Sequence, residues 1–242
     1  MLQAINRNKQ ILIGLVASVV LVGCNTMAVR GTGRSYEVTQ NIDPITEIEI
    51  RGNGELHIQN GNEDQFIVTA QDEIHEYLNI HRRGDRLIVE PKEGYYFKTD
   101  DAIKYTLITN NIENITISGA LKVISNDYKT ETLVIDASGS TDVDMTVTTN
   151  QLSLDISGSF DGYLAGNTQS FFTDFSGSAD LNAFDLFAED VDIDVSGAST
   201  LYVRANNHLN ISAAGAAKIY YKGAATVSQS SAGAVSITHS AD

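Results

Sequence analysis

Residues 152–164 read LSLDISGSFDGYL and have the clearest structural pattern of the chain. Apolar side chains alternate with polar ones before Gly158, and alternation resumes after it. A period of two is typical of a β-strand with one buried face. Glycine reaches backbone angles that other residues avoid, so Ser157-Gly158-Ser159 suits a sharp corner. The stretch therefore predicts a strand, a corner and a second strand.

The same pattern recurs through the C-terminal half of the chain. Each copy has an apolar or small residue, a small residue, a glycine and another small residue, and successive glycines are 18–20 residues apart. So regular a period indicates a repeat architecture. The seven corner glycines are Gly119, Gly139, Gly158, Gly177, Gly197, Gly215 and Gly233.

One such repeat cannot bury its apolar side chains alone, whereas stacked repeats share a continuous core. Parallel crossovers are right-handed in nearly all proteins. We therefore expect an all-β fold in which residues 115–242 form a right-handed parallel β-helix, a solenoid of about seven rungs of 18–20 residues. A β-propeller or a β-sandwich is the alternative, but a propeller blade needs about 40 residues.

The preceding residues 34–114 are also rich in strand patterns, but they are less regular. Residues 45–54 read ITEIEIRGNG and resemble a divergent copy of the repeat. Asn60-Gly61-Asn62 and Arg83-Gly84-Asp85 are typical of hairpin turns. The expected strands are residues 34–40, 45–51, 55–59, 65–71, 77–81, 86–90 and 103–109.

The beginning of the chain has the pattern of an export signal. Arg7 and Lys9 precede an apolar run at residues 11–22, which is too short to span a bilayer comfortably. The run ends in Leu21-Val22-Gly23-Cys24, which resembles the lipobox of bacterial lipoproteins. That resemblance implies cleavage before Cys24 and acylation of its thiol. Cys24 is the only cysteine, so no disulfide can form within the chain.

These patterns divide the chain into three parts. We expect a lipoprotein signal peptide over residues 1–23, a flexible tether over residues 24–33 and one β domain over residues 34–242. Asn25 follows the cysteine, where an Asp would resemble an inner-membrane retention signal. The expected location is therefore the outer membrane, reached through the lipid anchor, with the periplasmic and the external face both open.

Several stretches together resemble one known family. They are RGTGR at residues 30–34, ITEIEIRGNGELHIQNG at 45–61, DRLIVEP at 85–91, IKYTLITNNIENITISGA at 103–120 and the series of SGS and SGA corners. Their order and spacing are similar to those of the head GIN domain family of auto-transporter adhesins. The resemblance covers roughly residues 31–240. It implies a β-helical domain outside the cytoplasm and supplies no catalytic residues.

Aspartates occupy two fixed positions around the corner glycines. In a stacked solenoid each position forms a row along the axis. The first aspartate row lies three residues before the glycine and contains Asp136, Asp155, Asp174 and Asp194. The second aspartate row lies three residues after the glycine and contains Asp142, Asp161 and Asp180.

Such rows are electrostatically unfavourable unless something offsets them. Carboxylates about 5 Å apart repel by roughly 0.8 kcal/mol per pair even in water. In one interpretation, solvent, salt and splayed side chains suffice, and the aspartates cap turns and keep the solenoid soluble. In a second, the rows bind calcium, which prefers several oxygen ligands. In a third, they face a cationic partner. No other cofactor is expected.

Charge and motifs exclude several functions. The formal net charge is −15, so nucleic acid is not an expected partner. Residues 130–203 contain 13 Asp and Glu but no Lys, Arg or His, which leaves polysaccharide lyase chemistry without its cation and base. The five histidines lack the spacing of a metal site. No nucleophile elbow or phosphate-binding loop occurs.

The sequence therefore favours a non-catalytic, lipid-anchored envelope protein that adheres to or binds a protein or glycan. The alternatives are a periplasmic structural or assembly scaffold and, more remotely, a carbohydrate-active enzyme. The aromatic runs at residues 95–97 and 220–221 suit either packing or stacking on a sugar. An end rung offers an edge for pairing, so a homodimer is kept open.

Overall fold

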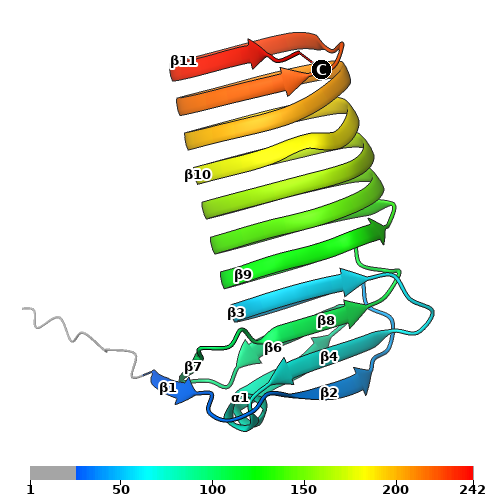
Figure 1. The fold of residues 1–242 in the computed structure, drawn as a ribbon, viewed down its shortest axis with the longest axis vertical. Coiled ribbons are helices and arrows are strands. Elements are labelled where there is room, and N and C mark those ends of the chain that lie inside the picture. The colour runs from blue at the N-terminus through cyan, green and yellow to red at the C-terminus, as the bar shows by residue number, and fades with distance from the viewer. Residues whose placement is uncertain (1–25, 242) are drawn as a thin grey trace, which may run out of the picture.

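The computed structural model describes residues 26–241, and its architecture is all-β with one short helix. A stack of strands rises from a smaller N-terminal part, which comprises residues 26–46 and 60–113 (Figure 1). The helix α1 spans Asp72–Tyr77. The strands are β1 Met27–Arg30, β2 Tyr36–Asn41, β3 Glu47–Gln59, β4 Gln65–Ala70, β5 Leu78–Arg83, β6 Arg86–Pro91, β7 Tyr95–Lys98, β8 Lys104–Ile108, β9 Asn114–Lys129, β10 Thr132–Lys222 and β11 Thr226–His239.

Parallel pairing joins β3, β9, β10 and β11 into one structure, which we call the parallel coil. Gly52 of β3 lies opposite Gly119 of β9, which lies opposite Gly139 at the start of β10. At the other end, Gly215 of β10 lies opposite Gly233 of β11. Between these points β10 winds through successive turns (Figure 1). The predicted repeat register is therefore confirmed, and residues 45–54 are a copy of the repeat.

The corner glycines stack directly on one another. Gly158 has φ of +129°, a conformation that L side chains rarely adopt. A Cβ at this position would also overlap the carbonyl oxygen of Gly139 on the previous turn. The corner therefore needs glycine for two independent reasons, which explains the regular period of the sequence.

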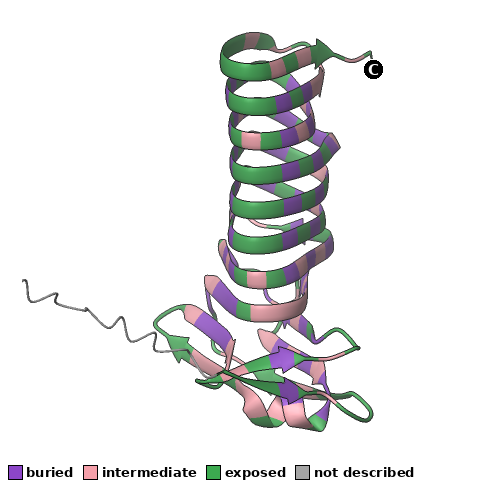
Figure 2. Cartoon of the chain, turned by 90° about the vertical axis from the view of Figure 1, so that its left-hand side faces the viewer, coloured by how far each residue is buried: buried purple, intermediate pink, exposed green. Residues whose placement is uncertain are grey.

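The core lies inside the parallel coil. Buried and exposed residues alternate along each turn (Figure 2). Leu154 and Ile193 are buried, and the rings of Phe160 and Phe175 pack with centroids 5.2 Å apart. The repeat thus buries a continuous apolar interior, as a solenoid requires.

A second corner is held by threonines rather than glycines. The Oγ1 atoms of Thr130, Thr149 and Thr168 donate hydrogen bonds to the carbonyl oxygens of residues on the preceding turn, namely Ile112, Glu131 and Asn150. Each hydroxyl also lies within hydrogen-bond distance of the carbonyl two residues further along the chain. These bonds satisfy backbone carbonyls where the strand bends.

The N-terminal part contains mixed sheets. β6 pairs in parallel with the first half of β3 and β8 with its second half. Antiparallel pairing then adds β5 to β6, β4 to β8 and β2 to β4. The pairs within the parallel coil are all parallel, and antiparallel pairing is confined to the N-terminal part. The right-handedness of the parallel coil and its number of rungs stay predictions.

The two expected hairpins have different outcomes. Gly84 and Asp85 connect β5 to β6, whose last and first residues Arg83 and Arg86 are paired, so this hairpin is confirmed. The hairpin at Asn60-Gly61-Asn62 is wrong, because β8 lies between β3 and β4. Instead, the side-chain amide of Asn60 donates a hydrogen bond to the carbonyl oxygen of Lys129 and accepts one from its backbone amide.

The predicted flexible tether is wrong for part of its length. Residues Met27–Arg30 form β1, which pairs in parallel with β7. Val29 is buried, and the amide of Met27 donates a hydrogen bond to the carbonyl oxygen of Gly94. This segment is therefore part of the folded domain.

An ion-pair network ties β3 to β6. Glu49 is only 7% exposed, and its two carboxylate oxygens lie 2.6 Å from Arg51 and 3.0 Å from Arg86. Arg51 also pairs with Glu90, and Arg86 with Glu47. These carboxylates raise the pKa of both arginines. The network holds the parallel coil to its N-terminal part.

Candidate binding surface

The first aspartate row lies on the outer face of the parallel coil, as predicted. Asp136, Asp155, Asp174 and Asp194 are exposed, while the residues on either side of each in sequence point inward and are buried. Stacking of the corner glycines places these aspartates on successive turns. Ser212 and Ser230 hold the same position on the following turns, so the row loses its charge toward the C-terminus.

The pKa values show that the carboxylates of this row interact. Partial burial raises the pKa of Asp174, and the charges of Asp155 and Asp194 raise it further. The same two causes raise the pKa of Asp136, with Asp155 as the charged neighbour. A carboxylate between two others is destabilised in its charged form, which a nearby cation would reverse.

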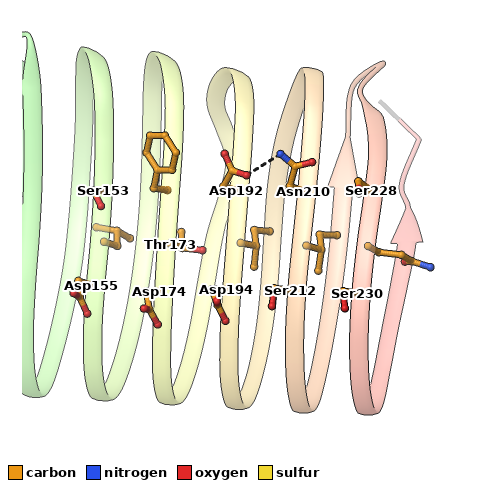
Figure 3. A pocket seen from close by; sticks show the side chains of 15 residues that line it. Ser153, Asp155, Thr173, Asp174, Asp192, Asp194, Asn210, Ser212, Ser228 and Ser230 are labelled. Atoms are coloured by element: carbon orange, nitrogen blue, oxygen red, sulfur yellow. Dashed lines mark hydrogen bonds between the residues drawn. The ribbon is translucent and has the colours of Figure 1, made fainter.

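A shallow groove of about 450 Å³ lies beside the first aspartate row (Figure 3). Its other side is formed by outward-facing residues five positions before the corner glycines, including Ser153, Phe172 and Asp192. Asn210 Nδ2 donates a hydrogen bond of 2.8 Å to Asp192 Oδ1 on the adjacent turn (Figure 3). Phe172 is 36% exposed, so the groove combines carboxylates, hydroxyls, an amide and one aromatic ring.

Sequence reasoning missed this second side of the groove. The residues five before each corner glycine are of mixed type, including Ser153, Phe172, Asp192 and Asn210, so no single residue type repeats. Only the register, once extended from the aspartates to their neighbours on the same face, could have revealed them.

The second aspartate row also faces outward. Asp142, Asp161 and Asp180 are exposed on turns whose corner glycines stack. Lys122 lies opposite Asp142 in the parallel register, so this row begins next to a cation. Farther along the same face, the Tyr163 hydroxyl donates a hydrogen bond of 2.9 Å to Asp185 Oδ2, which raises the pKa of Tyr163.

The structure contains a larger hollow away from both rows. A groove of about 970 Å³ lies beside the threonine corner, where the N-terminal part meets the parallel coil. Asn111, Glu113, Glu131 and Asn150 line it, among other residues. Pro44 and Ile45 also line it, so its lining is mixed, and the sequence gives no repeating signal for it.

No preformed metal cluster accompanies the rows. Within residues 26–241, no three His, Cys, Asp or Glu side chains converge in a way that could hold a metal ion. The residues that fit calcium are oxygen donors arranged in a line, so calcium binding by the rows stays a prediction.

The predicted lipidation site, Cys24, lies outside the described residues. The described part of the chain also has no helix long and apolar enough to cross a membrane.

Solved structures share this fold. A putative adhesin from Bacteroides fragilis is 20% identical, with a TM-score of 0.78 over 88% of this chain and 100% of that one. A putative lipid binding protein from Parabacteroides distasonis is 19% identical, with a TM-score of 0.73 over the same shares of the two chains, 88% and 100%. A putative adhesin from Parabacteroides distasonis is 21% identical, with a TM-score of 0.67 and again 88% and 100% coverage.

The sequence comparisons identify a family. No curated protein matches the chain. The family model described as "Putative auto-transporter adhesin, head GIN domain" matches residues 44–225, which include β4–β8 of the N-terminal part and the parallel coil up to the start of β11. This confirms the resemblance found in the sequence, and the chain belongs to that head GIN domain family.

Proposed function

We propose that this chain is a non-catalytic, lipid-anchored protein of the bacterial cell envelope that binds a partner through the acidic outer face of its coil. The observation that carries the proposal is the first aspartate row with the groove beside it. In this proposal the parallel coil is a right-handed β-helix, and its successive rungs space the carboxylates at about 4.8 Å.

The acidic face favours a cationic partner. Partial burial raises the pKa of Asp174, and the charges of Asp155 and Asp194 raise it further, so these carboxylates repel one another in the unbound protein. Lys or Arg side chains from a partner would replace that repulsion with attraction. Complementary charge of this kind speeds association and selects partners, and it weakens as salt is added.

Two observations support a binding role over catalysis. The family description is that of an adhesin domain and names no reaction. Residues 130–203, which supply the first aspartate row, contain no Lys, Arg or His that could act beside the carboxylates as a proton donor or a cation. Glycosidases do work with two carboxylates alone, but those face each other across a substrate. Here Asp155 and Asp174 stand in one row on one face (Figure 3).

Attachment to the envelope rests on Cys24, which follows the apolar run of residues 11–22. Several acyl chains on one residue hold a protein firmly to a membrane, because each buried CH2 contributes about 0.8 kcal/mol. The adhesin-like family is consistent with a place in the envelope. A surface position would make the chain an adhesin, and a periplasmic position would make it a scaffold.

Protease treatment of intact cells tests the adhesin proposal. We expect the wild-type protein to be degraded from outside and Cys24→Ala to be released from the membrane fraction. Protection of the wild-type protein until the outer membrane is broken would contradict surface adhesion and favour the periplasmic scaffold. Membrane retention of Cys24→Ala would contradict the lipid anchor.

Binding to poly-L-lysine tests the role of the acidic face. The double variant Asp155→Asn, Asp174→Asn should bind about 3- to 10-fold more weakly, as expected for two lost exposed charge pairs. The control variant Glu37→Gln, Asp43→Asn removes two charges from the N-terminal part and should bind like the wild type. Equal losses in both variants would mean that only net charge matters.

A further inference from the structure

The last turns of the parallel coil reverse the charge of the chain. Residues 130–194 contain 13 Asp and Glu and no Lys or Arg, whereas residues 195–241 contain Arg204, Lys218 and Lys222 and no Asp or Glu. In a chain of net charge −15, this is a local cationic region. Such charge asymmetry indicates a surface with its own partner.

Aromatic rings lie among these cations. Tyr202 and Tyr220 stack on adjacent turns, with centroids 4.9 Å apart and planes at 11°. Phe184 meets Tyr202 edge to face, with centroids 5.3 Å apart. The three rings form a file along the outer face of the coil. Phe187, nearby, is 50% exposed.

Two of the cations are fixed against these rings. The Arg204 guanidinium lies 4.9 Å from the Phe187 ring centroid, and Arg204 Nε donates a hydrogen bond to the carbonyl oxygen of Phe184. Lys222 Nζ lies 4.9 Å from the Phe184 centroid. Cation–π contacts and the hydrogen bond hold the charges in place before any ligand arrives. We call Phe184, Phe187, Tyr202, Arg204, Tyr220 and Lys222 the cation–aromatic patch.

Lys218 extends the cationic region. It is exposed and lies two residues before Tyr220, on the same side of the strand. Lys218 holds the position of the second aspartate row, three residues after its corner glycine, so this row changes from Asp to Lys along the axis. The Cα atoms of Lys218 and Lys222 are about 13 Å apart along the strand, and those of Arg204 and Lys222 are about 5 Å apart on adjacent turns.

We propose that the cation–aromatic patch and Lys218 bind an acidic polysaccharide, one whose sugar units bear carboxylate groups. A uronic acid unit has an apolar C–H face and a carboxylate, which match an aromatic ring beside a cation. Cations spaced along and across the strands can neutralise successive units of one polymer.

An acidic peptide is a weaker match to the same surface. Its carboxylates are carried on flexible side chains without a flat apolar face, so the file of three aromatic rings would contribute little to binding. The patch is also separate from the acidic face of the proposed function, since its cations lie on the turns after Asp194. Variants of Lys218 and Lys222 leave the aspartate rows unchanged.

Binding of polygalacturonate to the purified full-length chain tests the proposal. The wild-type protein should bind at low salt, with an affinity that falls as salt rises, and neutral dextran of similar length should not bind. Lys218→Gln should weaken binding about threefold, and Lys218→Gln with Lys222→Gln at least tenfold. Lys122→Gln is the matched control, because Lys122 holds the position of Lys218 on an early turn, and it should bind like the wild type.

Three results would overturn the proposal. They are no binding of polygalacturonate at low salt, equal losses in Lys122→Gln and Lys218→Gln, and binding of poly-glutamate as tight as that of polygalacturonate. The last result would assign the patch to an acidic protein. Lys218 is exposed, so its substitution should leave the melting temperature unchanged, and its threefold effect can be read even if the double variant is destabilised.

Discussion

Gly119 lies directly opposite Gly52, 67 residues away in sequence, and a side chain on Gly119 would overlap the carbonyl oxygen of Gly52. This contact joins β3, the first strand of the parallel coil, to β9. The same contact recurs at each following corner up to Gly233. The coil is therefore propagated by backbone atoms that approach too closely for any Cβ.

The first prediction concerns a central corner. Gly158→Ala should lower the free energy of unfolding by about 3–5 kcal/mol, because φ is +129° there and the new methyl group would overlap Gly139. Urea denaturation measures the loss. Gly84→Ala is the control: its φ is +64°, but a Cβ there meets nothing within 4 Å. It should cost only about 1–2 kcal/mol, and equal losses would refute the stacking argument.

The second prediction concerns repulsion within the first aspartate row. Asp174→Asn should stabilise the protein at pH 7 by about 1 kcal/mol, because it removes repulsion with Asp155 and Asp194. For a domain of this size the melting temperature should rise by about 2–4 °C. The gain should shrink in high salt. Glu37→Gln, an exposed carboxyl on β2, should change the melting temperature by less.

The same carboxyl gives a prediction for pH. The folded state raises the pKa of Asp174, so the folded protein binds a proton more readily than the unfolded chain. Stability from this group is therefore present below the unfolded pKa and lost as pH rises through the folded one. The difference in melting temperature between Asp174→Asn and the wild type should shrink as pH falls from 7 to about 4. A constant difference would contradict the cause assigned to the shift.

The parts of the fold that the sequence predicts are those where one residue type is required. Gly119 and Gly158 each meet a conformational and a steric requirement, so no other residue is tolerated and the period is visible. The register then places Asp155 and Asp174 on one outer face. The first aspartate row could therefore be found without a structure.

The parts that the sequence does not predict lack such a requirement. Thr130 and Thr149 hold a corner through hydroxyl bonds, but threonine is common throughout strands. β1 is four residues long and pairs with a strand far away in sequence. Helix α1 spans only Asp72–Tyr77, too short for a helical period to show. Tyr202 lies five residues after its corner glycine, and the same count on the preceding turn gives Asn182. The ring that contacts Tyr202 is instead that of Phe184, two residues later.

The fourth prediction concerns a hydroxyl inside the coil. Thr173 is 4% exposed, and its Oγ1 has no hydrogen-bond partner within the described structure. Leu154 and Ile193 hold the same inward position on neighbouring turns. Thr173→Val should therefore raise the free energy of unfolding by about 1 kcal/mol, because it removes an unpaired buried polar group. Thermal unfolding measures the change, and a destabilised variant would mean that the hydroxyl has a partner.

The last prediction concerns the network that ties the coil to its N-terminal part. Glu49→Gln should destabilise the protein by about 2 kcal/mol, because Arg51 and Arg86 would lose the buried carboxylate between them. Glu47 and Glu90 still pair with these arginines, so the loss should be smaller than for an isolated buried pair.

Urea denaturation in low and high salt measures the loss of stability in Glu49→Gln, with Asp43→Asn as the control. The Asp43 side chain is 89% exposed and pairs with Arg82 at 3.3 Å, so its loss should cost less than about 0.5 kcal/mol. Similar small losses in the two variants would mean that the network adds no more stability than a surface ion pair.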